Sequence, residues 1–202
     1  MTAPLTVGLG ELLWDRLSDR DRLGGAPFNV VCHLARLRHR AVFVTAVGCD
    51  DLGDAALREL RNRGVDDSFV TQSTSAPTGI ASVTLAADGA PTFEIVRPAA
   101  YEALRLDADT IAGLAALGPD ALVIGTLAHA ETDLLARTRA LVASLGTPTV
   151  AYDGNLRAGW WSIDLVRELA ALATVVKLNE DEARELAPAL GYPDGGRDIE
   201  GF

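Results

Sequence analysis

Positive charge and thiol groups are both scarce in this sequence. Its 202 residues contain 18 Lys and Arg against 28 Asp and Glu, which gives a formal net charge of −10 and a pI near 4.7. Phosphate backbones are bound by clusters of Lys and Arg, so this balance excludes a nucleic acid partner. The two cysteines, Cys32 and Cys49, form no CxxC pair and the three histidines are scattered, so no metal or redox centre is predicted from them.

We also expect neither a leader peptide nor an uninterrupted apolar run of membrane-spanning length. Residues 1–4 lead straight into the first predicted strand, with neither a basic region nor an apolar core, which predicts a cytoplasmic protein. The weakly charged stretch 110–129 is long enough to span a bilayer, but three glycines and a Pro-Asp pair divide it into helix, turn and strand. We therefore expect no membrane segment.

Apolar periodicities of helix and strand alternate along the chain. At 49% hydrophobic residues, 202 residues can bury one core. Gly64 should end the second helix as a left-handed cap. This alternation predicts an α/β fold, a parallel sheet with helices on both faces. The expected strands are 5–13, 41–47, 121–125, 149–153 and 174–177, and the expected helices are 27–38, 51–63, 108–117, 131–145, 164–173 and 180–190.

The stretch 70–98 breaks this alternation. Residues 80–86 and 91–96 are β-rich runs, and Ala87-Asp88-Gly89-Ala90 between them is typical of a hairpin turn. We expect an antiparallel insert here.

A glycine pair leads directly into the first helix. Gly24 and Gly25 precede Ala26-Pro27-Phe28-Asn29, where glycine allows a ligand close to the backbone and the helix terminus offers free N–H groups. Gly10-Glu11 and Asp15 lie about ten residues earlier and close a Val/Leu-rich strand pattern. A carboxylate such as Asp15 can accept hydrogen bonds from neighbouring hydroxyls of a polyol, although a solvated strand-end charge is the simpler alternative.

The glycine pair belongs to a series of short segments, rich in turn and polar residues, that occur in a fixed order along the chain. Together they cover nearly the whole chain and resemble the ribokinase-like (PfkB-type) carbohydrate kinases, with fructokinase nearest. The segments are Gly10–Asp15, Gly24–Val30, Leu34–Leu37, Ala46–Gly53, Arg63–Asp66, Pro77–Gly79, Asp153–Arg157 and Lys177–Glu182.

The resemblance implies roles for particular residues. It implies ATP and Mg²⁺ as cofactors and a sugar, fructose or a related keto sugar, as the substrate. The implied sugar contacts are Asp15, Gly24, Gly25, Asn29, Arg97, Asp153 and Arg157. The ATP and phosphate region would hold Lys177, Asn179 and Glu182, with Glu182 also near the Mg²⁺.

Simpler explanations exist for several of these residues. Asn179 with Glu182 three positions later is a capping box, which helix-end donors alone explain. Residues 153–157 suit an ordinary turn, and Arg97 suits an exposed strand edge. Asp153 and Asn179 each follow an apolar strand, however, and ligands of open α/β sheets bind at that end of the strands.

Residues 1–202 are expected to form one incomplete ribokinase-like α/β domain. The resemblance implies a β lid, from about 11–24 and 70–98, that also makes a homodimer contact. The family's G-A-G-D loop, whose Asp is the catalytic base, does not occur in the sequence. Gly195-Gly196-Arg197-Asp198 is interpreted as a linker, because no apolar strand precedes it. We expect a chain that stops inside the fold, has no catalytic base and is inactive alone.

Two other functions compete with a kinase. A non-enzymatic sugar-binding or regulatory protein derived from a kinase would also lack the base. A dinucleotide-dependent oxidoreductase is suggested by Gly8-Leu9-Gly10, but the third glycine and the following helix are missing, which argues against it.

Overall fold

The computed structural model describes residues 3–16, 20–85, 91–130, 133–146 and 148–188. The hairpin turn predicted at 87–90 and the linker predicted at 195–198 lie outside these ranges. No helix in the described ranges combines the length and apolar character needed to cross a bilayer.

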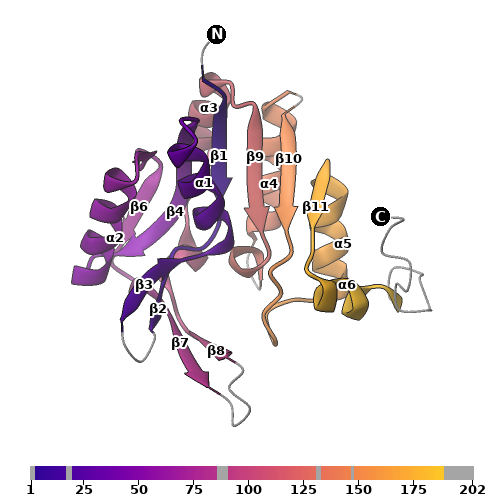
Figure 1. The fold of residues 1–202 in the computed structure, drawn as a ribbon. Coiled ribbons are helices and arrows are strands. Elements are labelled where there is room, and N and C mark those ends of the chain that lie inside the picture. The colour runs from indigo at the N-terminus through magenta and orange to yellow at the C-terminus, as the bar shows by residue number, and fades with distance from the viewer. Residues whose placement is uncertain (1–2, 17–19, 86–90, 131–132, 147, 189–202) are drawn as a thin grey trace.

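A seven-stranded parallel sheet forms the centre of the described structure (Figure 1). Its strands are β1 (Leu5–Leu9), β4 (Arg40–Gly48), β5 (Val65–Asp66), β6 (Val70–Ser73), β9 (Ala121–Gly125), β10 (Thr149–Asp153) and β11 (Val175–Lys177). The order is β11-β10-β9-β1-β4-β5, with β6 also paired to β4, and every pairing is parallel. The parallel sheet predicted from the alternation of strands and helices is therefore confirmed.

Helices cover both faces of this sheet. They are α1 (Ala26–Arg36), α2 (Asp51–Asn62), α3 (Ala108–Leu117), α4 (Leu134–Ser144), α5 (Ile163–Leu172) and α6 (Glu180–Leu186), with short 3₁₀ turns η1 (Ala100–Ala103) and η2 (Leu127–His129). Gly64, at φ 74°, follows α2 as predicted. Gly118 ends α3 in the same left-handed conformation, at φ 61°.

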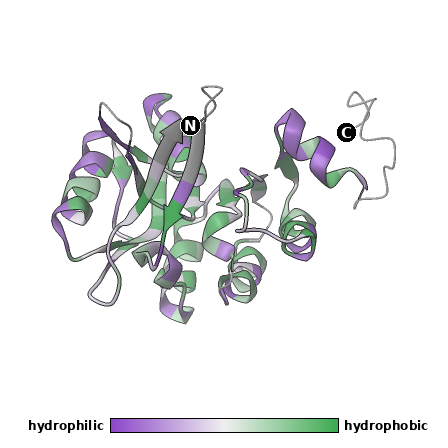
Figure 2. Ribbon diagram, turned by 90° about the horizontal axis from the view of Figure 1, so that it is seen from below, coloured by the Kyte–Doolittle hydropathy of each residue, from purple (hydrophilic) through white to green (hydrophobic). Residues whose placement is uncertain are grey.

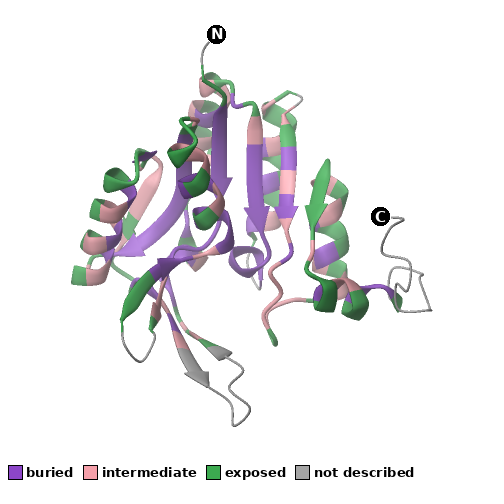
Figure 3. Ribbon diagram, viewed as in Figure 1, coloured by how far each residue is buried: buried purple, intermediate pink, exposed green. Residues whose placement is uncertain are grey.

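Alternate residues of the strands feed two separate cores. In β4, Val42 and Val44 belong to the core beneath α3, α4 and α5, whereas Ala41 and Phe43 belong to the core beneath α1 and α2. Side chains of successive strand residues point to opposite faces, so a strand buried on both faces needs this continuous apolar sequence. Figure 2 shows hydrophobic residues gathered between the layers. Figure 3 shows β1, β4 and β9 buried and the edge strand β11 exposed.

A second, smaller sheet projects from the carboxyl ends of the central strands (Figure 1). It contains β2 (Leu13–Arg16), β3 (Asp21–Gly24), β7 (Gly79–Leu85) and β8 (Pro91–Val96), in the order β3-β2-β7-β8. The β7–β8 pair is antiparallel as predicted, but β2 pairs with β7 in parallel, so the sheet is mixed and not purely antiparallel.

The predicted strand 5–13 is wrong in one respect, because it divides between the two sheets. Strand β1 ends at Leu9, and Leu13 begins β2 of the small sheet. Gly10 lies at the crossing, where a Cβ atom would come within 2.7 Å of Pro27 Cγ. The segment expected at 70–98 also divides, since β6 belongs to the large sheet and only β7 and β8 belong to the small one.

Asp50 and Thr78 fasten the small sheet to the end of β4. The Gly48 N–H donates to Thr78 Oγ1 (2.9 Å), and the Thr78 hydroxyl donates to Asp50 Oδ1 (2.6 Å). Asp50 also accepts from the Gly53 N–H at the start of α2. Burial pushes the pKa of Asp50 upward, but the hydrogen bonds from Thr78 and Gly53 outweigh it and lower the pKa below its usual value.

Candidate functional site

A cavity of about 330 Å³ lies where the carboxyl ends of the central strands meet the small sheet. The ends of parallel strands share one edge of a sheet, which is where open α/β folds bind ligands. Six of the residues predicted from the sequence line this cavity: Asp15, Gly25, Asn29, Asp153, Arg157 and Lys177. They come from β2, the start of α1, the end of β10 with its following loop, and the end of β11.

Asp15 enters the cavity from the small sheet, and Gly24 makes the space for it. The two lie on neighbouring strands, since Leu13 of β2 is aligned with Gly24 of β3. A Cβ atom on Gly24 would come within 2.4 Å of Asp15 Oδ2, so any side chain there would displace the carboxylate. Burial raises the pKa of Asp15, and Arg157 partly offsets the rise. Gly24 thus positions Asp15 without lining the cavity itself.

Gly25 forms the N-cap of α1 and brings the helix terminus against the residue after β1. Its φ of 129° is one that glycine adopts without strain, and a Cβ atom would lie 2.3 Å from the Glu11 carbonyl oxygen. The helix begins without a side-chain cap and without an acidic residue in its first turn. Its free N–H groups therefore need acceptors from elsewhere in the chain.

Glu11 supplies one of those acceptors from below the helix. The Ala26 N–H donates to Glu11 Oε1 at 2.8 Å, and the side chain is buried, with a relative exposure of 2% for the residue. Burial raises the pKa of Glu11 from its usual value near 4.5 to about 7, although its own backbone N–H, the Ala26 N–H and Arg157 all act in the opposite direction.

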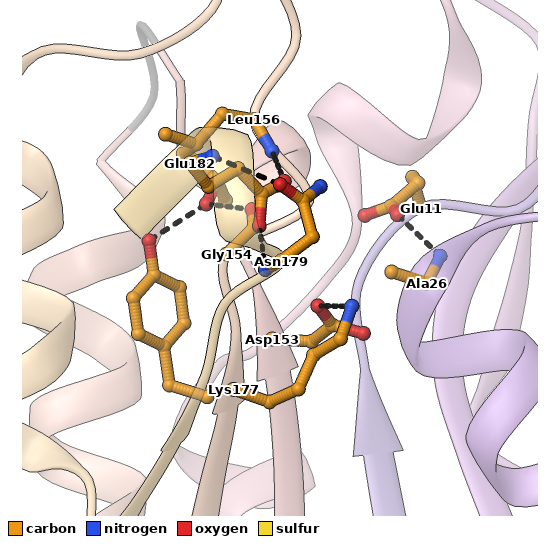
Figure 4. A network of polar contacts seen from close by, with 10 residues as sticks. Glu11, Ala26, Asp153, Gly154, Leu156, Lys177, Asn179 and Glu182 are labelled. Atoms are coloured by element: carbon orange, nitrogen blue, oxygen red, sulfur yellow. Dashed lines mark hydrogen bonds and ion pairs between the residues drawn. The ribbon is translucent and has the colours of Figure 1, made fainter. Parts of the chain in front are cut away.

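The loop after β10 carries the cavity residues of the opposite wall. Lys177, the sole lysine of the sequence, donates through Nζ to Asp153 Oδ1 at 2.9 Å. Behind them, the Thr126 hydroxyl donates to the Gly154 carbonyl (2.5 Å) and lies 2.8 Å from the Tyr152 hydroxyl. Figure 4 shows these contacts on one side of the site and the Glu11–Ala26 contact on the other. The loop is thus anchored at its first residues by buried hydrogen bonds.

Glu182 holds this loop to the start of α6. The predicted capping box is confirmed, because the Glu182 N–H donates to Asn179 Oδ1 and the Asn179 N–H donates to Glu182 Oε2, both at 2.9 Å. The other oxygen, Oε1, accepts from the Leu156 N–H at 2.9 Å (Figure 4). Glu182 is buried and, like Asn179, does not line the cavity.

The described residues do not provide a complete set of protein ligands for Mg²⁺. Both oxygens of Glu182 are engaged by backbone N–H groups. Across the described ranges, no three His, Cys, Asp or Glu side chains are grouped so that they could hold a metal ion. A role for Glu182 near Mg²⁺ stays a prediction.

Arg97, predicted to face the substrate, lies beside the cavity and does not line it. Its guanidinium pairs with Glu102 through Nε–Oε1 (2.5 Å) and Nη2–Oε2 (2.9 Å), and it stacks over the Trp160 ring at 4.4 Å from the centroid. The backbone N–H of Trp160 donates to the Arg157 carbonyl. Arg97 therefore connects the end of β8 to the turn that carries Arg157.

Three polar cavity residues were not assigned to the site from the sequence: Glu11, His33 and Asn155. Glu11 could have been found as a single carboxylate enclosed by apolar residues on both sides. His33 lies one helical turn after Asn29, a spacing that puts both on one face of α1. Asn155 has a left-handed backbone, φ 38°, which no pattern in its turn sequence specifies.

Chemically, the cavity suits a small neutral molecule with several hydroxyl groups. Asp15, Glu11 and Asn29 offer acceptors on one wall, while Arg157 offers donors on the other, next to the ion pair of Lys177 with Asp153. Such mixed donors and acceptors within a polyol-sized space can satisfy many hydroxyls at once.

Comparison of the sequence with known families identifies one match over most of the chain. Residues 16–200 match the model of the pfkB family carbohydrate kinases. Probable fructokinase-5 of Arabidopsis thaliana is 26% identical over 89% of this chain, and fructokinase-1 of rice (Oryza sativa subsp. japonica) is 34% identical over 68%. The chain spans 61% and 43% of the lengths of these two relatives, respectively.

Solved structures share the same fold. Fructokinase from Vibrio cholerae O395 in its apo form superimposes with a TM-score of 0.79 at 27% identity, covering 97% of this chain and 70% of the other. The same enzyme described in a fructose, ADP and calcium ion bound form gives a TM-score of 0.77 at 25% identity, covering 98% and 67%.

Proposed function

The chain belongs to the pfkB family of carbohydrate kinases, and we propose that the protein transfers the γ-phosphate of ATP to a hydroxyl group of a sugar. We propose fructose or a related keto sugar as the acceptor, with Mg²⁺ accompanying ATP. The observation that carries this proposal is the cavity itself, which gathers Asp15, Asn29, Asp153 and Arg157 at the carboxyl ends of the strands.

The preference for fructose is supported by the relatives. Those of Arabidopsis and rice carry the name fructokinase, and the Vibrio cholerae structure is described with fructose and ADP bound. A keto sugar in this cavity would place vicinal hydroxyls against Asp15 and Asn29, with Arg157 facing the hydroxyl that accepts the phosphate. A planar guanidinium offers paired donors to a transferring phosphate, which supports that role.

The ATP side of the site would begin at the end of β11. Lys177 lines the cavity and carries a positive charge, and Asn179 two residues later starts α6. Phosphoryl transfer also needs a base and a set of N–H donors for the γ-phosphate. The G-A-G-D loop that supplies both in the family does not occur within residues 1–202. We therefore propose that these residues bind sugar but do not turn over by themselves.

The small sheet is proposed to act as a lid over the sugar and as the contact of a homodimer. Its strands β2, β7 and β8 each contribute a cavity residue, Asp15, Ala81 and Ile95 respectively, which supports the lid. The requirement for ATP favours a cytoplasmic location.

The test is sugar-dependent ADP release. Residues 1–202 alone and the full-length product of the gene would be assayed with fructose, glucose and ribose. We expect turnover by the full-length protein, highest with fructose, and none by residues 1–202. Turnover by the short chain would contradict its proposed inactivity, and sugar binding without turnover by the full-length protein would contradict the kinase.

Matched variants locate the site. Asp15→Asn in the full-length protein should lower kcat/KM for fructose about 100-fold or more, because the sugar hydroxyls lose the charged oxygen to which they donate hydrogen bonds. Asp109→Asn, in the first turn of α3 and outside the cavity, should leave kcat/KM unchanged. Equal losses in both variants would show that Asp15 acts through folding and not through the sugar.

A further inference from the structure

One oxygen of Glu11 is buried without a hydrogen-bond partner. Oε1 accepts from the Ala26 N–H, but for Oε2 the described residues provide none. A carboxylate oxygen left in this state costs free energy, because its hydration is lost and not replaced. Such an orphaned polar atom in a native protein calls for an explanation.

The orphaned oxygen belongs to the cavity. Glu11 lines it beside Ala26 and Asn29, and Oε2 lies 3.6 Å from the position that a Cβ atom on Gly125 would occupy, at the end of β9. Figure 4 shows this oxygen directed away from Ala26, toward the side of the site that holds Gly154 and Asp153. Because Oε2 is enclosed in the empty site, a ligand between the two walls would reach it through a rotation of the Glu11 side chain.

The electrostatic surroundings leave Glu11 close to half ionised at neutral pH. Burial raises its pKa to about 7, while Arg157 favours the charged form and Asp153 opposes it. The other titratable groups that face this region are Asp15 on β2, His33 on α1, Lys177 on β11 and Tyr101 on η1. A hydrogen bond donated to Oε2 would favour the charged form further.

We propose that Oε2 of Glu11 accepts a hydrogen bond from a hydroxyl group of the sugar, and that sugar binding releases the Glu11 proton to solvent. This rests on the proposed function for the identity of the ligand. In the empty site at neutral pH, the molecules in which Glu11 is protonated avoid an unsolvated charge. The bound hydroxyl replaces the missing water, so the carboxylate forms and the proton leaves.

The consequence is binding that tightens as the pH rises. A ligand that binds the ionised carboxylate lowers its pKa, so affinity increases through the titration range of the free group. Between pH 6 and pH 8 we expect the Kd for fructose to fall about tenfold. Glu11 would thus set both the affinity of the site and its response to neutral pH.

The experiment is titration calorimetry of the full-length protein with fructose. Heats would be compared at pH 7 in buffers of different ionisation enthalpy, which reports the protons released on binding. Wild-type protein should release a substantial fraction of one proton. Glu11→Gln keeps an acceptor for the Ala26 N–H but cannot ionise, so it should release none from this position, bind more weakly at pH 8 and lose the tenfold pH dependence.

Two controls separate this role from others. Asp107→Asn alters a carboxylate that caps α3 through the Thr110 N–H, away from the cavity, and should keep the proton release. Asp15→Asn should weaken binding while keeping the release at pH 7, because Glu11 remains. Circular dichroism and unfolding midpoints would verify that each variant is folded.

The outcomes distinguish the two proposals. Fructose binding by wild-type protein with the same proton release in Glu11→Gln would overturn the role of Glu11 and leave the kinase intact. Absence of binding to any of the sugars by the wild-type protein would overturn both. A Glu11→Gln variant with wild-type affinity at all pH values would show that Glu11 serves only as an acceptor for the start of α1.

Discussion

Two buried glutamates lie at the starts of helices on opposite sides of the cavity, and they are in opposite states. Glu182 at α6 has both oxygens occupied, by the N–H groups of Leu156 and Asn179. Glu11 beneath α1 has one oxygen occupied, by Ala26. A carboxylate that accepts a backbone hydrogen bond on each oxygen stabilises the fold. A carboxylate with one unpaired oxygen can accept a hydrogen bond from a ligand.

The origin of the two contacts differs as well. Glu182 is part of α6 itself and caps its own helix within three residues. Glu11 lies in the link between β1 and β2 and reaches a helix whose own first turn contains no acid. A helix that caps itself can be rigid before any ligand arrives. The start of α1 depends on a residue that also faces the cavity, so ligand and helix are linked through one side chain.

The largest effect is expected from Glu182→Ala. Two backbone donors would each lose a buried partner, and each such loss costs roughly 1–3 kcal/mol, so the free energy of unfolding should fall by about 2–6 kcal/mol. Urea unfolding measures this. Glu180→Ala, an exposed acid of the same turn paired with Arg184, is the control and should change stability by less than about 1 kcal/mol. An equal loss of stability in Glu182→Ala and Glu180→Ala would contradict the structural role of Glu182.

Glu11→Gln should raise the free energy of unfolding at high pH, whereas Glu182→Ala lowers it. A carboxyl whose pKa is raised by folding binds its proton more tightly in the native state, so the protein loses stability as the pH rises from about 4.5 to about 7. The shift corresponds to about 3 kcal/mol above pH 7, which the uncharged variant would recover. Urea unfolding at pH 8 should show the variant more stable than wild type, and at pH 4.5 the two should match. A variant that is less stable at pH 8 would show that the charge of Glu11 is already compensated.

Thr126→Val tests a second anchor of the loop after β10, which Glu182 also holds. The variant keeps the shape of the side chain but removes the hydroxyl that contacts the Gly154 carbonyl and Tyr152, at a cost of about 1–3 kcal/mol. Hydrogen exchange of the Leu156 amide should also accelerate, because the loop loses one of its anchors. Unchanged exchange would mean that Glu182 alone fixes the loop.

The smallest effect on stability is expected from Lys177→Met. Its ion pair with Asp153 is largely exposed on the lysine side, at 59%, and exposed pairs contribute under about 1 kcal/mol. Sugar binding should change little, whereas the KM for ATP should rise if Lys177 serves the phosphate side. A fall in stability comparable to that of Glu182→Ala would show that this pair, too, is structural.

The same contrast explains what could be predicted from the sequence. The capping box at Asn179 is local, so three residues of spacing are enough to identify it, and the bounds of α3, β9 and β10 follow from equally local periodicity. The parallel pairing of β2 with β7 and the break of the first strand at Gly10 depend on distant segments. The spacing of residues along the sequence does not indicate contacts between such distant segments.

Individual site residues follow this rule. Asp15 and Asn29 were predicted to share a site because a glycine turn connects them, and both line the cavity. The family resemblance places Arg97 at the substrate, whereas in the structure Arg97 pairs with Glu102 and stacks on Trp160, and neither partner is marked by the sequence. The unpaired oxygen of Glu11 is a property of packing from three elements, which only the structure reveals.

The parallel pairing between β2 and β7 also constrains the order in which the molecule assembles. Leu13 aligns with Gly79, and the segment between them supplies α1, β4 and α2 of the large layers. Closing so long a loop is entropically costly until the intervening elements have docked, so the two hairpins can form early but their junction must form late. The small sheet over the cavity is thus expected to be the last part to form in folding. It should also be the first part to open when the native state unfolds locally.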